Sequence, residues 1–344
     1  MTFMKTALRS VATAAILAGM AATAHAQEVT LKLHQFLPAQ ANVPKLVLDV
    51  WADKVEADSN GRIKIDRFPS MQLGGTPPEL INQVIDGVAD IVWTVAGYTP
   101  GRFPQAEVFE LPFMMTNAEA TSRAYWDYAE ANLLDTEFKD FKTLGVWVHG
   151  PGVIHSKNPI TSVADLNGVK LRAPTRTTTQ LFTALGATPI GMPVPAIPES
   201  LSKGVIDAAV IPWEVTASLK MSELVGNHTE FGGESLYTTS FIFAMNKDKY
   251  EALPDDLKAV IDNNSGLEFS AFAGKTQAAG DAPSREVAVA AGNNIITLTP
   301  EQLEEWKTAA AGVEAAWIDS LNKTGLDGQA VVDQARALIE KHSN

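Results

Sequence analysis

The sequence predicts a mixed α/β fold with mostly parallel sheet, divided into two lobes. Short apolar runs that alternate in period two are separated by longer stretches with a helical period, which is the pattern of strand-helix-strand units. The chain has 344 residues, a length that fits two domains better than one. A short pattern also occurs twice, around residues 79–94 and 199–214, as expected if two similar lobes face each other across a cleft.

The N-terminus has the features of an export signal. Lys5 and Arg9 give a positive start, an apolar run extends over residues 11–22, and Ala24-His25-Ala26 supplies small residues around a cleavage point before Gln27. An uncleaved membrane anchor is the alternative, but the apolar run is too short to span a bilayer. We therefore predict a cleaved signal peptide over residues 1–26 and an exported mature protein.

In the first part of the chain, period-two alternation predicts strands and apolar residues three or four apart predict helices. The first strand alternates Val29, Leu31 and Leu33 with polar neighbours, and Thr76 with two prolines opens a helix that Gly87 stops. The elements expected are a strand over 28–36, a helix over 44–57, a strand over 61–68, a helix over 76–86, a strand over 90–94, a helix over 118–133 and a strand over 144–148.

Gly150-Pro151-Gly152 forms a joint that opens the second part. Leu303, Trp306 and Val313 lie on one face of the strongest amphipathic helix of the chain. The elements expected are a strand over 168–174 with a helix after it, a helix over 199–203, strands over 207–211 and 241–245, a helix over 256–262, a helical stretch over 266–291 interrupted near Pro283, a strand over 295–298, and helices over 300–321 and 331–339.

The repeated pattern joins a helix to a strand in both parts. Residues 79–90 and 199–207 each contain a helix, a stopping glycine, and an aspartate that opens an apolar strand. If the repeat is real, Trp93-Thr94 and the stretch from Ile211 to Glu214 lie at equivalent strand ends. The alternative is coincidence, because Gly and Asp are common in any connection from a helix to a strand.

Arg172 lies where a strand ends and a helix begins. In the stretch 168–174, Val169 and Leu171 face one side of the strand and Lys170 and Arg172 the other, and Pro174 stops the hydrogen-bond ladder. In open α/β sheets that position is the ligand-binding edge, and a guanidinium there can bind a carboxylate through two hydrogen bonds. The alternative is a strand-end arginine in a salt bridge with a neighbouring acidic residue.

Composition excludes several classes of partner and site. The formal net charge is −13 and no basic block is visible, so nucleic acid is a poor partner. The chain has no cysteine, which excludes disulfides, thiolate metal sites and cysteine nucleophiles. The sequence contains no phosphate-binding loop, no Gly-x-Ser-x-Gly and no His-Glu-x-x-His. We therefore expect a protein that is not an enzyme.

A series of short motifs, in order, resembles a known family. They are Leu73-Gly74, Phe109-Glu-Leu-Pro-Phe113, Asp165-Leu-Asn-Gly-Val-Lys-Leu-Arg172-Ala-Pro174, Leu185-Gly-Ala187, Met192-Pro193, Glu199 with Leu201, Gly204-Val-Ile-Asp207, Met245-Asn-Lys-Asp248 and Leu253-Pro254. In their order and spacing the chain resembles the solute-binding proteins of tripartite ATP-independent periplasmic (TRAP) transporters over nearly all of its mature length.

The resemblance implies a two-lobed periplasmic binding protein fold with long connecting helices that closes over an organic anion. It implies that Arg172 pairs with the ligand carboxylate and that the protein delivers its ligand to integral membrane subunits. We expect residues 27–148 with about 238–277 to form lobe 1, residues 149–237 with about 278–325 to form lobe 2, and residues 326–344 to form a C-terminal helix.

Departures from the family pattern bear on the ligand. Members that bind sialic acid carry an asparagine near Ile211 and a second arginine within the segment 149–158, and this chain has neither. Side chains expected to form the walls are Phe36, Trp93, Tyr98, Trp213 and Phe241, each of which has core packing as its alternative. One arginine and several aromatic residues favour a monocarboxylate with an apolar or aromatic body, with 2-oxo acids among the candidates.

Three further residues complete the predicted site. Thr94 follows Trp93 at the strand end, and His155 is a candidate to bond a ligand oxygen, with a structural role as its alternative. Glu214 is a candidate for a cation that bridges to the ligand, although no cofactor or metal is expected to be required. Two other functions stay open: a binding protein of another importer or sensor, and a secreted enzyme built on two lobes.

Overall fold

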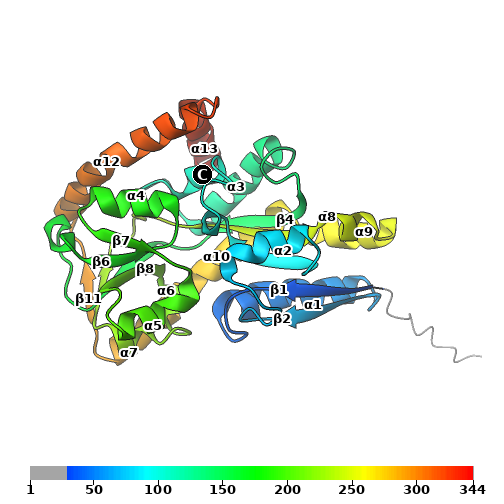
Figure 1. The fold of residues 1–344 in the computed structure, drawn as a ribbon, viewed down its shortest axis with the longest axis horizontal. Helices are drawn as coiled ribbons and strands as arrows, with labels where there is room; N and C mark the ends of the chain where they lie inside the picture. Colours follow the sequence, from blue (N-terminus) through cyan, green and yellow to red (C-terminus); the bar gives the residue numbers. More distant parts are fainter. Residues whose placement is uncertain (1–28, 344) are drawn as a thin grey trace, which may run out of the picture.

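The structure is a computed structural model, and it describes residues 29–343. The predicted signal peptide, residues 1–26, lies outside the described residues. Two β-sheets lie side by side along the long axis of the molecule, with helices on their faces (Figure 1). Within residues 29–343 no helix is both long enough and apolar enough to cross a bilayer.

The first sheet has the strand order β2-β1-β3-β10-β4. Strands β1, β2 and β3 are parallel to their neighbours, whereas β10 is antiparallel to both β3 and β4. The bounds are β1 Val29–His34, β2 Ile63–Phe68, β3 Ile91–Val95, β4 Phe141–Val148 and β10 Ser240–Asn246.

The second sheet has the order β11-β9-β5-β8-β6-β7. Strand β5 is antiparallel to both β8 and β9, and the remaining pairs are parallel. The bounds are β5 Gly152–Ser156, β6 Lys170–Ala173, β7 Thr188–Gly191, β8 Ala208–Pro212, β9 Asn227–Glu230 and β11 Asn294–Thr297.

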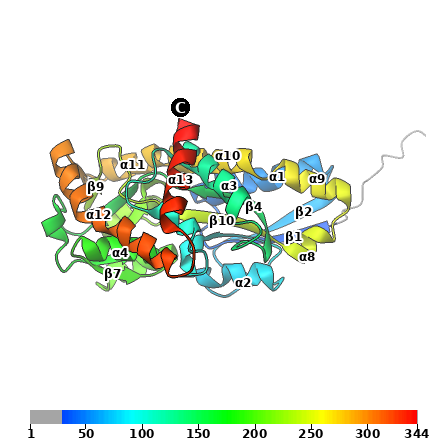
Figure 2. The same cartoon turned by 90° about the horizontal axis from the view of Figure 1, so that it is seen from above.

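The helices cover both sheets and connect them. In Figure 2 the chain ends in α13, which packs against α3 beside the first sheet, while α12 packs against α4 beside the second. The α-helices are α1 Asp49–Asp58, α2 Leu80–Ile85, α3 Ala118–Asn132, α4 Arg176–Ala184, α5 Ile197–Ser202, α6 Trp213–Thr216, α7 Met221–Leu224, α8 Lys247–Glu251, α9 Asp255–Asn263, α10 Leu267–Ala279, α11 Asp281–Ala290, α12 Pro300–Asn322 and α13 Gly328–Ser343. The shorter turns are η1 Pro44–Leu48, η2 Pro77–Glu79, η3 Ala96–Tyr98, η4 Ala106–Glu110, η5 Val163–Leu166 and η6 Val194–Ala196.

The sheets are mixed, whereas the sequence pattern predicted mostly parallel ones. The two antiparallel strands have one cause. Strand β5 enters the second sheet directly from β4 of the first, and β10 enters the first sheet from β9 of the second. In each sheet, strands joined through helices run parallel to one another. Strands β5 and β10 arrive from the other sheet and not through such a helix, and each runs antiparallel to its neighbours. Two short segments, residues 149–151 and 231–239, make these crossings.

Three strands were not predicted, and each lacks the usual signal. Strand β7 lies at the sheet edge and contains Pro189, which is tolerated there because an edge residue needs no second backbone partner. Strand β9, Asn-His-Thr-Glu, is polar throughout, and β5 contains His155.

The helical stretch over 266–291 is interrupted at Gly280, between α10 and α11, and not at Pro283 as predicted. Pro283 lies in the first turn of α11, where the backbone N–H that proline lacks would have no helical partner.

The two copies of the repeated pattern have the same geometry. The backbone N–H of Lys32 donates to Asp90 Oδ2 at 2.8 Å, and that of Lys170 donates to Asp207 Oδ2 at 3.2 Å. In return, the N–H of each aspartate donates to the carbonyl of the same lysine, at 3.0 and 2.8 Å. Each aspartate thereby fixes the start of its strand, β3 or β8, against the neighbouring strand.

Candidate ligand-binding site

Arg172 is placed by the end of strand β6. Leu171 packs into the core of the second sheet, so the alternation of the strand turns Arg172 to the other side. Pro174 follows the strand, and Thr175 caps α4 by accepting a hydrogen bond from the N–H of Thr178. The side chain of Arg172 is only 1% exposed, which is unusual for a residue with a permanent charge.

The guanidinium of Arg172 makes its bonds to uncharged oxygens. Nε donates to the carbonyl of Met192 and Nη1 to that of Val210, both at 2.9 Å, and Nη2 lies 3.5 Å from the hydroxyl of Tyr98. Within residues 29–343 no carboxylate lies within ion-pair distance of it. The alternative of an internal salt bridge is therefore not what the structure contains. Burial lowers the pKa of the guanidinium, but an arginine keeps its charge in proteins.

A buried charge without a counter-ion is costly unless a ligand supplies one. The guanidinium faces a cavity of about 380 Å³, including the part open to solvent, between the two sheets. The cavity is lined by Phe36, Leu37, Trp93, Val95, Tyr98, His149, Arg172, Pro174, Val194, Ile211, Pro212, Glu214, Val215, Tyr237, Thr239, Phe241 and Gln277. Both lobes contribute, so the cavity exists only when the two sheets are brought together.

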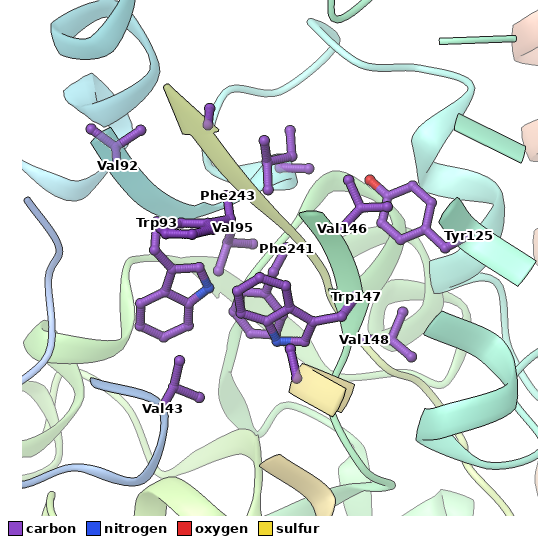
Figure 3. Close-up of a cluster of buried hydrophobic side chains, with 14 of the residues drawn as sticks. Val43, Val92, Trp93, Val95, Tyr125, Val146, Trp147, Val148, Phe241 and Phe243 are labelled. Carbon is purple, nitrogen blue, oxygen red and sulfur yellow. The ribbon is translucent and has the colours of Figure 1, made fainter. Parts of the chain in front are cut away.

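Aromatic rings from the first sheet form one wall of this cavity. Phe36 stacks on Trp93 with ring centroids 4.6 Å apart, and Trp93 stacks on Phe241 at 5.2 Å. Figure 3 shows Trp93, Phe241 and Trp147 next to one another, from three strands of the sheet. These rings make the cavity suited to an apolar body that packs against them.

Several polar atoms in the cavity lack a partner. The unpaired atoms are Trp93 Nε1, the Tyr237 hydroxyl and Glu214 Oε2. The Tyr98 oxygen accepts a bond from the N–H of Val194 at 2.9 Å, which leaves its own hydrogen free to donate. Burial raises the pKa of both tyrosines, so both hydroxyls stay protonated. Buried polar groups are normally paired, and this group of unpaired atoms therefore indicates a site for polar atoms of a ligand.

His149 is held as a neutral ring. Burial, with a smaller contribution from the nearby charge of Arg172, lowers its pKa to about 4. Its Nδ1 lies 2.5 Å from the carbonyl of Gly150, which can only accept, so Nδ1 carries the hydrogen. Nε2 then accepts from the hydroxyl of Thr239 at 2.7 Å. His149 therefore adds no second positive charge beside Arg172.

Seven of the ten predicted site residues line the cavity: Arg172, Trp93, Phe36, Ile211, Tyr98, Glu214 and Phe241. The other three do not. Thr94 is on the opposite face of β3 from Trp93 and Val95, because side chains alternate along a strand. Its backbone pairs with Ile242, and its side chain is buried.

Trp213 and His155 lie behind the cavity. Trp213 donates from Nε1 to Glu230 at 2.8 Å and packs on the rings of His155 and His228. His155 Nε2 donates to the carbonyl of Ile211 at 3.2 Å, so His155 supports a lining residue without lining the cavity itself. The repeat explains why Trp213 was expected to line the cavity although it does not. Counting from Asp90 and Asp207, the equivalent of Trp93 is Val210, and Trp213 comes three residues later.

The cavity also contains residues that were not predicted to belong to the site. Tyr237 and Thr239 lie in the crossing segment 231–239, His149 begins the other crossing, and Gln277 lies in α10. No periodic pattern marks them, because they come from irregular segments or from one position of a long helix. In residues 29–343 no three histidine or acidic side chains converge on a point where a metal ion would fit. A bridging cation at Glu214 stays a prediction.

Comparisons with known proteins agree with this geometry. Residues 35–319 match the family described as bacterial extracellular solute-binding protein, family 7. A TRAP solute-binding protein from Rhodoferax ferrireducens, solved with copurified benzoate, is 53% identical, with a TM-score of 0.90, covering 92% of this chain and 98% of that one. A marine metagenome protein specific for aromatic acids, solved with 3-hydroxybenzoate, is 51% identical, with a TM-score of 0.90, covering 92% and 100%. The outer membrane transporter protein TsaT of Comamonas testosteroni is 28% identical over 96% of this chain and 97% of its own length.

Proposed function

This chain belongs to family 7 of the bacterial extracellular solute-binding proteins, the solute-binding proteins of TRAP transporters, and from that premise we propose that it captures an aromatic monocarboxylate through Arg172. The single observation that carries the proposal is the buried guanidinium without a counter-ion, facing a cavity with an aromatic wall.

The carboxylate of the ligand supplies the missing negative charge. A guanidinium has five N–H donors, and three of those of Arg172 have the partners described above. The remaining N–H groups bind the carboxylate, and the hydroxyl hydrogens of Tyr98 and Tyr237 add two neutral donors near the same charge. Charge-assisted bonds of this kind gain strength where water is excluded.

The body of the ligand is flat and apolar. It lies against Phe36, Trp93 and Phe241, with Ile211 on the side of the second lobe. One cation serves one carboxylate, which disfavours dicarboxylates, and the few polar side chains disfavour sugar acids. The two relatives that are half identical to this chain were solved with benzoate and 3-hydroxybenzoate, which supports the same class of ligand here. Aromatic 2-oxo acids satisfy the same requirements and stay within the proposal.

The proposal also covers the location of the protein and the fate of its ligand. The mature protein works in the periplasm, hands its ligand unchanged to the integral membrane subunits of a TRAP transporter, and catalyses no reaction. Lobe 1 comprises residues 27–148 with about 238–277, and lobe 2 comprises 149–237 with about 278–325. The distribution of the strands between the two sheets supports this division.

The test is a ligand screen on the mature protein by thermal shift and calorimetry. We expect benzoate, hydroxybenzoates and aromatic 2-oxo acids to raise the melting temperature, by an amount that corresponds to about 2.7 kcal/mol at a ligand concentration 100 times the Kd. Stabilisation by C4-dicarboxylates or sugar acids, with none by aromatic acids, would overturn the proposal. Mass spectrometry of the recovered ligand distinguishes binding from catalysis, because an enzyme would return a changed molecule.

A further inference from the structure

Glu214 is a buried carboxyl group inside the cavity that the capture of a carboxylate does not use. It lies in α6, directly after β8, and its side chain is 5% exposed. It lines the same cavity as Arg172. A second acidic group in a cavity that binds an anion needs its own explanation, because a negative charge there would repel the ligand.

One oxygen of Glu214 is held in place by two other parts of the chain. Glu214 Oε1 accepts a hydrogen bond from Gln277 Nε2 at 2.8 Å. Gln277 Oε1 in turn accepts from Trp147 Nε1 at 2.7 Å, which fixes which end of the amide faces Glu214. All three side chains are buried. The carboxyl group is therefore oriented before any ligand arrives.

The other oxygen, Oε2, has no partner and is buried. Burial, with a smaller contribution from the carboxylate of Asp281, raises the pKa of Glu214 to about 8. Asp281 Oδ1 accepts from the backbone N–H of Glu214 at 2.8 Å. At neutral pH the group is mostly a neutral acid. Since Oε1 accepts from Gln277, the proton resides on Oε2, which can then donate one hydrogen bond and accept another.

Glu214 and Arg172 reach the cavity from different elements. Arg172 lies near the end of β6, whereas Glu214 lies in α6, after β8, and within residues 29–343 no carboxylate is within ion-pair distance of Arg172. The free donors of Arg172 and the unpaired Oε2 of Glu214 are therefore two separate polar groups in the cavity. Trp93, whose unpaired Nε1–H can donate to a ligand oxygen, lines the same cavity.

We propose that Glu214 is a specificity-determining residue that binds a hydroxyl group on the aromatic body of the ligand, so that this protein prefers hydroxylated aromatic acids over unsubstituted ones. The inference rests on the proposed function. A ligand with a carboxylate at one position and a hydroxyl at another satisfies both Arg172 and the unpaired Oε2. A site built to hydrogen-bond a hydroxyl discriminates strongly against analogues without one, because its own buried group is then left unpaired.

The first test needs no variant. Affinities are measured by calorimetry for benzoate, for the three ring isomers of hydroxybenzoate, and for the methylbenzoate that matches the best isomer. Methyl and hydroxyl groups are similar in size, so the pair isolates the hydrogen bond. We expect the best hydroxybenzoate to bind about tenfold or more tightly than its methyl analogue. Equal affinities for the two would overturn the inference and leave the proposed function intact, whereas no binding of any aromatic acid would overturn the proposed function.

The second test assigns the effect to the residue. Glu214→Leu is expected to reduce the preference for the hydroxyl analogue to about threefold or less while benzoate still binds, and Glu214→Gln is expected to keep most of it, because its amide can bond both Gln277 and the ligand. Melting temperatures of both variants verify folding. If Glu214→Leu does not fold, Gln277→Leu, which releases Oε1, is expected to weaken the preference instead. A preference that survives the loss of the carboxyl group contradicts the assignment.

The third measurement separates a hydroxyl from a cation. The affinity series is repeated in sodium-free buffer containing a chelator. We expect the same preference for the hydroxyl analogue in both buffers. A preference that disappears without the cation would mean that Glu214 binds the ion and not the hydroxyl, and the inference would fall.

Discussion

Strands β1 and β6 are held by the same arrangement of hydrogen bonds, which we call the Asp–Lys frame, but the side chains that follow the two lysines differ in how their polar atoms are used. Asp90 and Asp207 make equivalent bonds to Lys32 and Lys170, so His34, two residues after Lys32, occupies the position that Arg172 has in the second lobe. The polar atoms of His34 are all used within its lobe. Nδ1 donates to Gln83 Oε1 at 2.8 Å, and Nε2 accepts from the N–H of Leu73 at 3.3 Å.

Arg172, by contrast, leaves donors to the cavity between the lobes. In the first lobe, His34 bonds only to residues of its own lobe, and the lobe contributes aromatic side chains and Tyr98 to the cavity. The second lobe offers the charge. The same backbone arrangement thus holds one side chain whose hydrogen bonds are all satisfied within its lobe, His34, and one that keeps free donors, Arg172, for which we propose ligand binding.

The largest expected effect separates these two residues. Arg172→Ala removes at least two charge-assisted bonds to the ligand, and we expect it to weaken the binding of an aromatic carboxylate by about 100-fold or more. Arg172→Lys is also expected to fail, because an ammonium cannot reproduce the planar fork. His34→Ala, the matched variant in the other lobe, is expected to lower the melting temperature while the Kd changes by about threefold or less. Calorimetry gives both answers, and wild-type affinity in Arg172→Ala would falsify the central assignment.

The next effect concerns the contact between the lobes. Gly97, after β3, packs against Thr175, after β6, so closely that an added Cβ would lie 2.4 Å from Thr175 Cγ2 and 2.7 Å from its Cβ. Gly97→Ala is therefore expected to hold the lobes apart and weaken binding by about tenfold or more, because neither atom can move freely. Small-angle scattering should show a smaller contraction on adding ligand.

Two further variants serve as controls for Gly97. Gly226→Ala introduces the same methyl group into open space, and it is expected to bind as the wild type does. Thr175→Ser keeps the capping hydroxyl but removes Cγ2, so adding it to Gly97→Ala should restore part of the affinity. Full affinity in Gly97→Ala alone would show that closure does not need this contact.

The frame itself can be tested by removing the two aspartates. Asp90 is buried at 2% exposure and its bond to Lys32 is the shorter one, whereas Asp207 is partly exposed. We expect Asp90→Ala to lower the free energy of unfolding by about 1.5–3 kcal/mol, and Asp207→Ala to lower it by less. Urea unfolding measures both. Equal losses would mean that the frame matters equally in the two lobes and that burial does not decide the difference.

The smallest effect is a dependence of stability on pH to which both lobes contribute. Burial raises the pKa of Glu110 and Glu137 to about 7, that of Asp281 to about 7, and that of Glu214 to about 8. A raised pKa in the folded state means that the stabilising contribution is complete below the unfolded pKa and is lost as the pH rises through the folded one.

The buried histidines act in the opposite direction, but at lower pH. Burial lowers the pKa of His34, His149, His155 and His228, so their contribution is lost as the pH falls below about 6.5. Above about pH 7.5 the histidines are neutral in both states, so between pH 7.5 and 8.5 only the carboxyl groups titrate, and the melting temperature should fall by about 2–4 °C. Glu137→Gln in the first lobe and Glu214→Gln in the second should each reduce the fall. A melting temperature that rises over this range would contradict the burial of these groups.

Most of the fold was predictable because it rests on local patterns. The helix over 300–321 was expected from its apolar face and is α12, and the turn chemistry of Gly87 and Gly204, both with positive φ, marked the two equivalent helix ends. Strand β7 was not predicted because it contains a proline, which only an edge strand tolerates. Strand β9 was not predicted because its four residues are polar, and its place in the sheet depends on pairing with β5 and β11. The antiparallel direction of β5 and β10 was missed because it depends on which sheet the chain enters next.

The sequence by itself determined that a guanidinium stands at a strand end, since alternation and Pro174 are properties of the chain around Arg172. It did not determine which aromatic residues surround that charge, because Trp213 and Trp93 were equally good candidates for the cavity wall. Only the tertiary structure decided between them, because the direction of each ring depends on the register of its strand and on the partners that neighbouring segments offer. The same reason explains Glu214. A glutamate in a sequence is an ordinary charged residue, and it becomes a neutral, unpaired donor only when Gln277 and Asp281, from a distant part of the chain, are packed beside it.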